Sequence, residues 1–162
     1  MGKEAKTNAM RILDRAGISY TSMTYSCDSF LDGETVARTL GLDPDRCFKT
    51  LVAVGKSGNH FVFVLPVSQE LDLKKAARSV GEKSVSLIPV NMLEPLTGYL
   101  RGGCTAIGMK KRFPTRLALQ AQKYSSIAVS GGRRGLQLEL APDDLLRACD
   151  GAYADLLQDN VT

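Results

Sequence analysis

The clearest fold signal in the chain is FKTLVAVGKSGNHFVFVLPV, which occupies residues 48–67 of 162. Two apolar runs, Phe48–Val54 and Phe61–Val67, flank residues 55–59, which read GKSGN. Apolar runs rich in β-formers and joined by a short Gly/Asn-rich turn are typical of a β-hairpin. We therefore predict two paired strands in this stretch.

Further strands are predicted on both sides of this hairpin. Residues 18–25 alternate and contain β-formers, and residues 85–88 form a short apolar run. Ile127–Ser130 and Leu136–Leu140 flank Gly131–Gly135, so we predict a second hairpin there.

Helices are predicted where a capping residue precedes apolar residues at helical spacing. Thr7, Asp32 and Asp72 can cap helices that run to about Ala16, Leu40 and Val80, and a glycine follows each of these helices. Pro142 suits the first turn of a last helix, with Asp143 and Asp144 near its positive end. Because strands outnumber helices and neighbours look like hairpins, we predict an α/β (α+β type) fold with a mixed, mostly antiparallel sheet flanked by helices. With no repeat or linker, residues 1–162 are expected to form a single domain.

Composition excludes several classes of protein. No apolar run approaches the roughly 20 residues of a membrane span, and the first residues lack the apolar core of a secretion signal, so a cytoplasmic location is expected. The four cysteines form no CxxC pair and His60 is the sole histidine, so no metal site is expected and the thiols are expected to be reduced. No GxxxxGK[ST], HExxH or strand-to-helix GxGxxG string occurs, which leaves no support for a bound cofactor.

Lys49 is the first candidate for chemistry, because it interrupts an apolar strand. A lysine held in a partly buried pocket needs an anion or a carbonyl to face. The alternative is a lysine on an edge strand that discourages aggregation. The residues alone leave both interpretations open.

Two glycine-rich segments are the other candidates. Residues 97–111 (TGYLRGGCTAIGMKK) contain four glycines, whose backbone N–H groups could approach a carboxylate, a phosphate or a developing oxyanion. Residues 130–135 (SGGRRG) could place Ser130 and a backbone amide at a pocket wall. An irregular loop and a flexible turn are the alternative interpretations. Basic residues cluster here too, and they suit either phosphate binding or a solvated surface.

These segments resemble the YbaK/EbsC family, free-standing relatives of the editing domain of bacterial prolyl-tRNA synthetase. The resemblance covers nearly the whole chain, through strings that are specific only in combination: residues 6–9 (KTNA), 48–51 (FKTL), 70–75 (ELDLKK), 97–111, 114–115 (PT), 130–135 and 140–145 (LAPDDL). It implies an aminoacyl-tRNA deacylase that removes cysteine wrongly attached to proline tRNA. It also implies that Cys-tRNA(Cys) can be a substrate. It further implies a ternary complex with prolyl-tRNA synthetase and no membrane or DNA partner.

The resemblance also implies roles for particular residues. Lys49 matches the lysine regarded as essential, and Gly102 matches a glycine that approaches the substrate. Other positions implied to bind substrate are Tyr25, Phe30, Thr50, Gly103, Ser130, Gly131 and Gln137. The mechanism proposed for the family is substrate-assisted: the cysteine thiolate attacks its own ester carbonyl, which agrees with the lack of a convincing protein nucleophile.

The chain departs from the family pattern in two places. It has Thr105-Ala106 where many relatives have Ser-Pro, and Gln137 where some carry an acidic residue. These departures leave open a deacylase for another small amino acid such as alanine. A tRNA- or synthetase-binding module without catalysis is the alternative from another class. Cys104 stands where relatives commonly have an apolar residue, so we expect it to act as a small hydrophobe.

Overall fold

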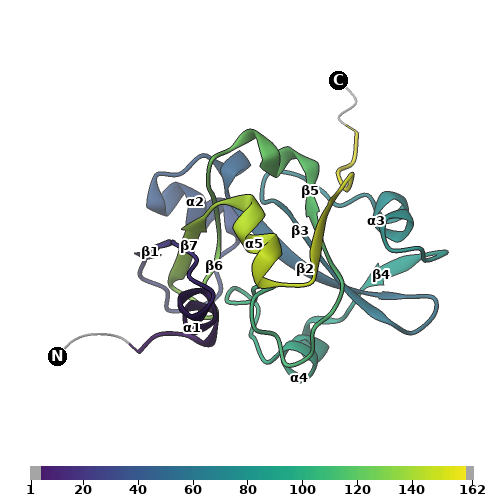
Figure 1. Cartoon of the computed structure of the whole chain (residues 1–162), viewed down its shortest axis with the longest axis horizontal. Helices are drawn as coiled ribbons and strands as arrows, with labels where there is room; N and C mark the ends of the chain where they lie inside the picture. Colours follow the sequence, from purple (N-terminus) through teal and green to yellow (C-terminus); the bar gives the residue numbers. More distant parts are fainter. Residues whose placement is uncertain (1–4, 160–162) are drawn as a thin grey trace.

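A computed structural model describes residues 5–159, so the expected domain limits at residues 1 and 162 lie outside the described residues (Figure 1). The helices are α1 (Asn8–Arg15), α2 (Gly33–Leu40), α3 (Leu73–Ser79), α4 (Leu93–Thr97) and α5 (Pro142–Ala148). The strands are β1 (Thr21–Thr24), β2 (Phe48–Gly55), β3 (His60–Pro66), β4 (Val85–Leu87), β5 (Thr115–Ala118), β6 (Ile127–Ser130), β7 (Leu136–Leu140) and β8 (Gly151–Ala154). Short 3-10 turns lie at Pro44–Arg46, Val90–Met92 and Leu119–Lys123.

The strands form two sheets. The larger sheet has the order β4-β2-β3-β5-β8, in which β2 runs antiparallel to β3 and β4, whereas β3, β5 and β8 run parallel. The smaller sheet has the order β1-β7-β6 and is antiparallel throughout. The predicted α/β fold with mixed, mostly antiparallel strands flanked by helices is confirmed, although two sheets share the strands.

The predicted central hairpin is confirmed with small differences at its ends. β2 continues one residue further, to Gly55, and β3 is shifted by one residue, to His60–Pro66. The register pairs Lys49 with Leu65 and Val54 with His60. Because β3 lies inside the sheet, its side chains from Phe61 onward are buried on both faces, which accounts for its unbroken apolar sequence.

The two sheets meet at β2 and β6. Cys47, just before β2, forms a parallel bridge with Ala128 in the middle of β6. One hydrophobic cluster contains fully buried residues from both sheets, among them Phe63, Leu65 and Leu138. Packing of this kind fixes the start of β2 against the end of β6, where the candidate residues Lys49 and Ser130 lie.

Several expectations from the sequence need correction. The strand predicted over residues 18–25 spans only Thr21–Thr24, because β1 is an edge strand that pairs with four residues of β7. The strand at residues 85–88 ends at Leu87. β5, β8 and α4 were not predicted, since each has only four or five residues and no clear periodicity.

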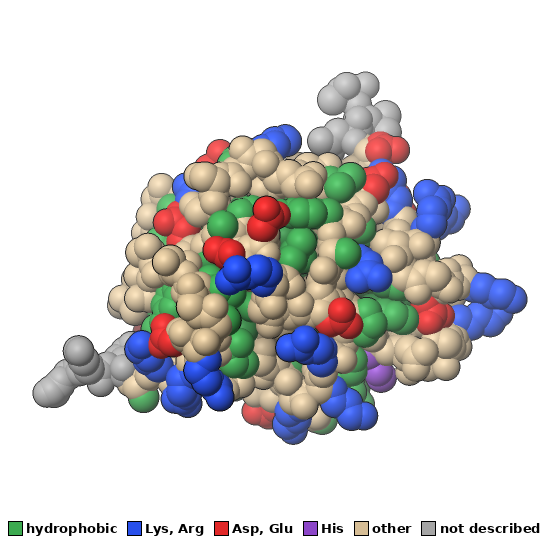
Figure 2. Space-filling view, in the orientation of Figure 1, with side chains coloured by type: hydrophobic (Ala, Val, Ile, Leu, Met, Phe, Trp, Pro, Cys, Tyr) green, Lys and Arg blue, Asp and Glu red, His purple; other side chains and the backbone are tan. Residues whose placement is uncertain are grey.

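The helices surround the sheets, and none is long and apolar enough to cross a bilayer within residues 5–159. In Figure 1, α1 and α5 lie on the near side, and α3 packs beside β4 at one end. Figure 2 shows Lys and Arg side chains spread over this near face, with a group near α1.

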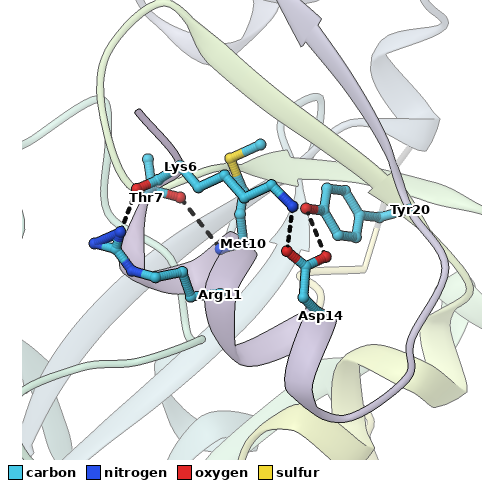
Figure 3. Close-up of polar contacts among 6 residues, drawn as sticks. All are labelled: Lys6, Thr7, Met10, Arg11, Asp14 and Tyr20. Atoms are coloured by element: carbon cyan, nitrogen blue, oxygen red, sulfur yellow. Dashed lines mark hydrogen bonds and ion pairs between the residues drawn. The ribbon is translucent and has the colours of Figure 1, made fainter. Parts of the chain in front are cut away.

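The predicted helix caps are formed. The side chains of Thr7, Asp32 and Asp72 accept hydrogen bonds from backbone N–H groups in the first turns of α1, α2 and α3. Asp14 of α1 also pairs with Lys6 and accepts a hydrogen bond of 3.0 Å from the Tyr20 hydroxyl (Figure 3). The hydrogen bond from Lys6 lowers the pKa of the Asp14 carboxyl. These contacts hold both ends of α1 to the segments that flank it.

Candidate functional site

A cavity of about 600 Å³ lies where the start of β2 faces the ends of β6 and β7. Its walls come from segments far apart in the chain: the loop after β1, α2, β2, the segment after β3, α4, the glycine-rich loop of residues 97–111 (the glycine loop) and the β6–β7 hairpin. Seven of the nine residues proposed from the family resemblance line it, namely Tyr25, Phe30, Lys49, Thr50, Gly102, Ser130 and Gln137.

Lys49 is half-buried in β2, directly opposite Leu65 of β3. Within residues 5–159 its ammonium group makes no hydrogen bond or ion pair, whereas the buried ends of other cations are paired, as Arg46 is with Glu139. A partly desolvated cation without a counter-ion is stabilised when an anion or a carbonyl dipole faces it. This position suits a ligand with such a group. The edge-strand alternative stays open, because β4 pairs with β2 only at residues 53–55, and among residues 5–159 the strand paired with Lys49 is β3.

Ser130 and Gln137 connect the hairpin to the glycine loop. The Ser130 hydroxyl donates to the carbonyl oxygen of Gly102 at 3.2 Å, and the Gln137 amide approaches the Ser130 hydroxyl at 3.5 Å. Gly102 has a φ of +93°, a conformation that disfavours other residues. A Cβ at this position would lie 3.2 Å from the Phe30 ring. Glycine therefore allows both the turn and the close approach of the loop to the cavity wall.

Phe30 and Arg101 form a stacked pair at the edge of the cavity. The Arg101 guanidinium carbon lies 4.0 Å from the centre of the Phe30 ring, and that of Arg134 lies 6.0 Å from it. The Arg134 Nε donates to the Arg101 carbonyl oxygen at 2.8 Å. The loop after β1, the glycine loop and the β6–β7 turn (residues 131–135) are thus joined at one place.

Tyr25 and Thr50 complete the predicted lining. Tyr25 lies just beyond β1, and its backbone N–H donates to the Gly135 carbonyl at 3.0 Å, which fixes it beside the β6–β7 turn. Thr50 follows Lys49 in β2 and is half-buried. Both positions are therefore held by regular backbone pairing.

Gly103 and Gly131 do not line the cavity. A Cβ on Gly103 would lie 2.7 Å from the backbone of Arg133, and one on Gly131 would lie 2.7 Å from the Leu136 side chain. Gly103 allows the glycine loop to pack closely against the β6–β7 turn, whereas Gly131 leaves room for the side chains of β7 in its own hairpin. A direct part for them in substrate binding stays a prediction.

Two cysteines line the cavity, but neither resembles a nucleophile. Burial raises the pKa of the Cys47 thiol to about 11 and that of Cys104 to about 12. At neutral pH both remain protonated, and the thiolate is the reactive form. Cys104 is 7% exposed, as expected of a small hydrophobe. Within residues 5–159, no three His, Cys, Asp or Glu side chains gather in a way that could hold a metal ion.

The sequence model of the aminoacyl-tRNA editing domain matches residues 30–148, which include most of the cavity lining. The chain belongs to the aminoacyl-tRNA editing domain family. Of the seven lining residues named above, all except Tyr25 lie inside the matched range.

Other proteins resemble this chain in sequence or in fold. EbsC of Enterococcus faecalis, named as a candidate Cys-tRNA(Pro)/Cys-tRNA(Cys) deacylase, is 47% identical over 154 residues, which cover 94% of each chain. A candidate trans-editing enzyme for prolyl-tRNA synthetase has a similar fold, with a TM-score of 0.79 and 24% identity over 96% of this chain and all of the other. A hypothetical protein of known structure gives a TM-score of 0.84 at 20% identity, covering 94% of this chain and all of the other.

The editing-domain cavity also contains residues that the sequence analysis did not select. Arg101 lies within residues 97–111 and Glu70 within residues 70–75, but the resemblance implies no role for either residue. Leu93 lies in neither segment. Arg101 stands beside Gly102, so its place in the glycine loop was a usable signal. Leu93 gave none, because its position depends on α4, a helix of five residues.

Thr105 is fully buried and its hydroxyl has no hydrogen-bond partner within residues 5–159.

Proposed function

We propose that this protein is a trans-acting aminoacyl-tRNA deacylase that removes mischarged cysteine from tRNA(Pro) and also acts on Cys-tRNA(Cys). The observation that carries this proposal is the gathering of Lys49 and the glycine loop around one cavity whose own thiols stay protonated. The 47% identity to EbsC, together with that protein's name, supports the same substrate.

The reaction needs little chemistry from the protein, because an aminoacyl ester is already activated. In the proposed step the substrate's thiolate sulfur attacks its own carbonyl carbon, the ester C–O bond breaks, and the tRNA leaves as a 3′ oxyanion that takes up a proton. The product is a cyclic thioester of cysteine. The protein contributes position and electrostatic stabilisation of the developing charge. We propose that Lys49 and the backbone N–H groups of the glycine loop stabilise this charge.

An editing site of this kind answers a specific problem of selectivity. Cysteine and proline are similar in size, so a synthetase pocket separates them weakly, and a second site must remove the wrong product. A site that depends on the substrate's thiol would spare proline, because proline has no such group. Selectivity would then come from the chemistry of the substrate as well as from the shape of the cavity.

Selection of the tRNA is proposed to require a partner. The net charge of +4 and the basic side chains on the face in Figure 2 suit contacts with phosphates, which carry no base sequence information. We therefore propose a ternary complex with prolyl-tRNA synthetase in the cytoplasm. Binding to free tRNA is expected to be weak and to weaken further as salt is added.

The proposal is tested with tRNA(Pro) charged with cysteine, alanine or proline, and with Cys-tRNA(Cys), each with and without prolyl-tRNA synthetase. Release of cysteine alone is the expected result. Release of alanine in preference would favour a deacylase for that amino acid, the alternative left open by Thr105-Ala106 and Gln137. No release from any substrate, with tRNA still bound, would favour a binding module without catalysis.

A further inference from the structure

Three cationic side chains line the cavity, and the proposed substrate contains two different groups that can interact with them. Arg38, Lys49 and Arg101 all line it. An aminoacyl ester has lost its carboxylate, so apart from the reacting cysteine thiolate the negative charges of the substrate are the phosphates of the RNA chain. The ester carbonyl becomes negative only during the reaction. One cation can therefore serve the phosphate while another serves the carbonyl.

Burial separates the roles of Lys49 and Arg101. Lys49 is half-buried in β2, where it pairs with Leu65 of β3, whereas Arg101 is exposed in the glycine loop. An RNA chain reaches the cavity from solvent. The free-energy cost of removing water from its phosphate is smallest when the phosphate binds near the surface. The exposed cation is the better partner for the phosphate. The half-buried cation is the better partner for charge that develops in a less hydrated place.

The Arg101 side chain is also held ready for a phosphate. Its guanidinium stacks 4.0 Å from the Phe30 ring centre, while within residues 5–159 its N–H groups make no hydrogen bond and no carboxylate forms an ion pair with it. Stacking occupies the face of the guanidinium and leaves the N–H groups at its edge for a bidentate contact. Arg38 is less suited, because its guanidinium already donates to the Thr35 hydroxyl at 3.3 Å.

A second arginine strengthens the positive charge at this place. The Arg134 guanidinium lies 6.0 Å from the same ring centre, and Arg134 is bonded to the backbone of Arg101. Two like charges that share one ring repel each other, and an anion placed at the edge of the pair would relieve this repulsion.

We propose that Arg101, stacked on Phe30, binds the phosphate on the 5′ side of the tRNA's terminal adenosine. Lys49 then remains available to stabilise the charge that develops on the ester carbonyl. This inference rests on the proposed deacylase function. Arg101 becomes a substrate-binding residue for the RNA part of the substrate. The phosphate contact then sets how far the aminoacyl group enters the cavity.

The test uses two minimal substrates that differ by one group: 3′-O-cysteinyl adenosine and the same ester with a 5′ phosphate. The native protein is expected to favour the phosphorylated ester in kcat/KM by roughly tenfold, the scale of one charge-assisted contact. Arg101→Ala should abolish this preference, so that kcat/KM for the phosphorylated ester falls to about that for the unphosphorylated ester. Arg101→Lys should restore part of it, because a point charge replaces the planar fork.

Matched variants separate this inference from the deacylase function itself. Arg147→Ala removes an exposed arginine from α5, which does not line the cavity, and should keep the preference. Lys49→Ala should slow release from both esters alike. A preference that survives in Arg101→Ala, or equal losses on both esters, would overturn the inference while leaving the function intact. A native protein that releases cysteine from neither ester nor Cys-tRNA(Pro) would overturn the function, and the inference with it.

Discussion

The hydroxyl of Ser130 donates a hydrogen bond of 3.2 Å to the carbonyl oxygen of Gly102, across 28 positions of the chain. This contact joins the end of β6 to the glycine loop at the wall of the cavity. Since residues 98–111 of the loop form no helix or strand, such contacts determine its position. The shape of this cavity wall therefore depends on the hydrogen bond between Ser130 and Gly102.

Ser130→Ala should therefore make the glycine loop less ordered, with only a small loss in the free energy of unfolding. Loss of one partly buried hydrogen bond costs about 1 kcal/mol, and we expect kcat/KM for cysteine release to fall roughly tenfold as the loop becomes less ordered. Kinetics and urea unfolding measure the two effects. Ser125→Ala, at an exposed serine ahead of β6, is the control and should change neither. Unchanged kinetics in Ser130→Ala would show that the contact does not position the loop.

Gly102→Ala should impair activity through crowding at the cavity edge. The added methyl group would lie 3.2 Å from both the Phe30 ring and the Arg134 side chain. Gly58→Ala is a matched control, because Gly58 has a φ of +92°, close to the +93° of Gly102, but nothing lies within 4 Å of its Cβ position. Both variants should lose about 1 kcal/mol of stability from the left-handed backbone. Only Gly102→Ala should lose activity, and equal activities would contradict the account of the cavity wall.

Cys104→Ala should keep most of the deacylase activity, although the thiol lies in the cavity wall. Its pKa of about 12 leaves it protonated through the range from pH 6 to pH 9, so it supplies no nucleophile there. The rate should instead rise with pH and level off near the ordinary thiol pKa of about 8.5, as the substrate's own thiol ionises. Release rates of the native protein and the variant, corrected for spontaneous hydrolysis, measure this. Loss of activity in a folded Cys104→Ala protein would point to a protein thiol.

The fold was predictable where local patterns and tertiary packing agree. The turn at residues 55–59 and the caps Thr7, Asp32 and Asp72 were clear because each acts through neighbours in the sequence. β5 and β8 were missed because they are stabilised by parallel pairing between distant segments, and the four residues GAYA of β8 have little β-propensity of their own.

The cavity was predictable only in part, for a related physical reason. Seven lining positions followed from resemblance to the family, but the residues alone could not show which side chains meet. The stacking of Arg101 on Phe30 joins two loops separated by 71 positions, and no local pattern encodes such a contact. In the sequence, Gly103 and Gly131 are indistinguishable from Gly102, yet they do not line the cavity. Glycine is needed at these two positions for close packing against other parts of the protein.

Lys49 is central to the account because it is half-buried, lines the cavity and has no partner within residues 5–159. Lys49→Ala should leave stability almost unchanged, since it removes no contact of this ammonium group. It should lower kcat/KM by at least about 100-fold if the ammonium stabilises charge at the ester. Lys56→Ala, in the exposed β2–β3 turn, is the matched control and should behave like the native protein.

The most direct measurement is release of radiolabelled cysteine from Cys-tRNA(Pro) by the native protein, Lys49→Ala and Lys56→Ala, with Ala-tRNA(Pro) as the substrate control. We predict rapid release of cysteine by the native protein and Lys56→Ala, little release by a folded Lys49→Ala, and no release of alanine. Equal release by the native protein and Lys49→Ala would contradict this prediction.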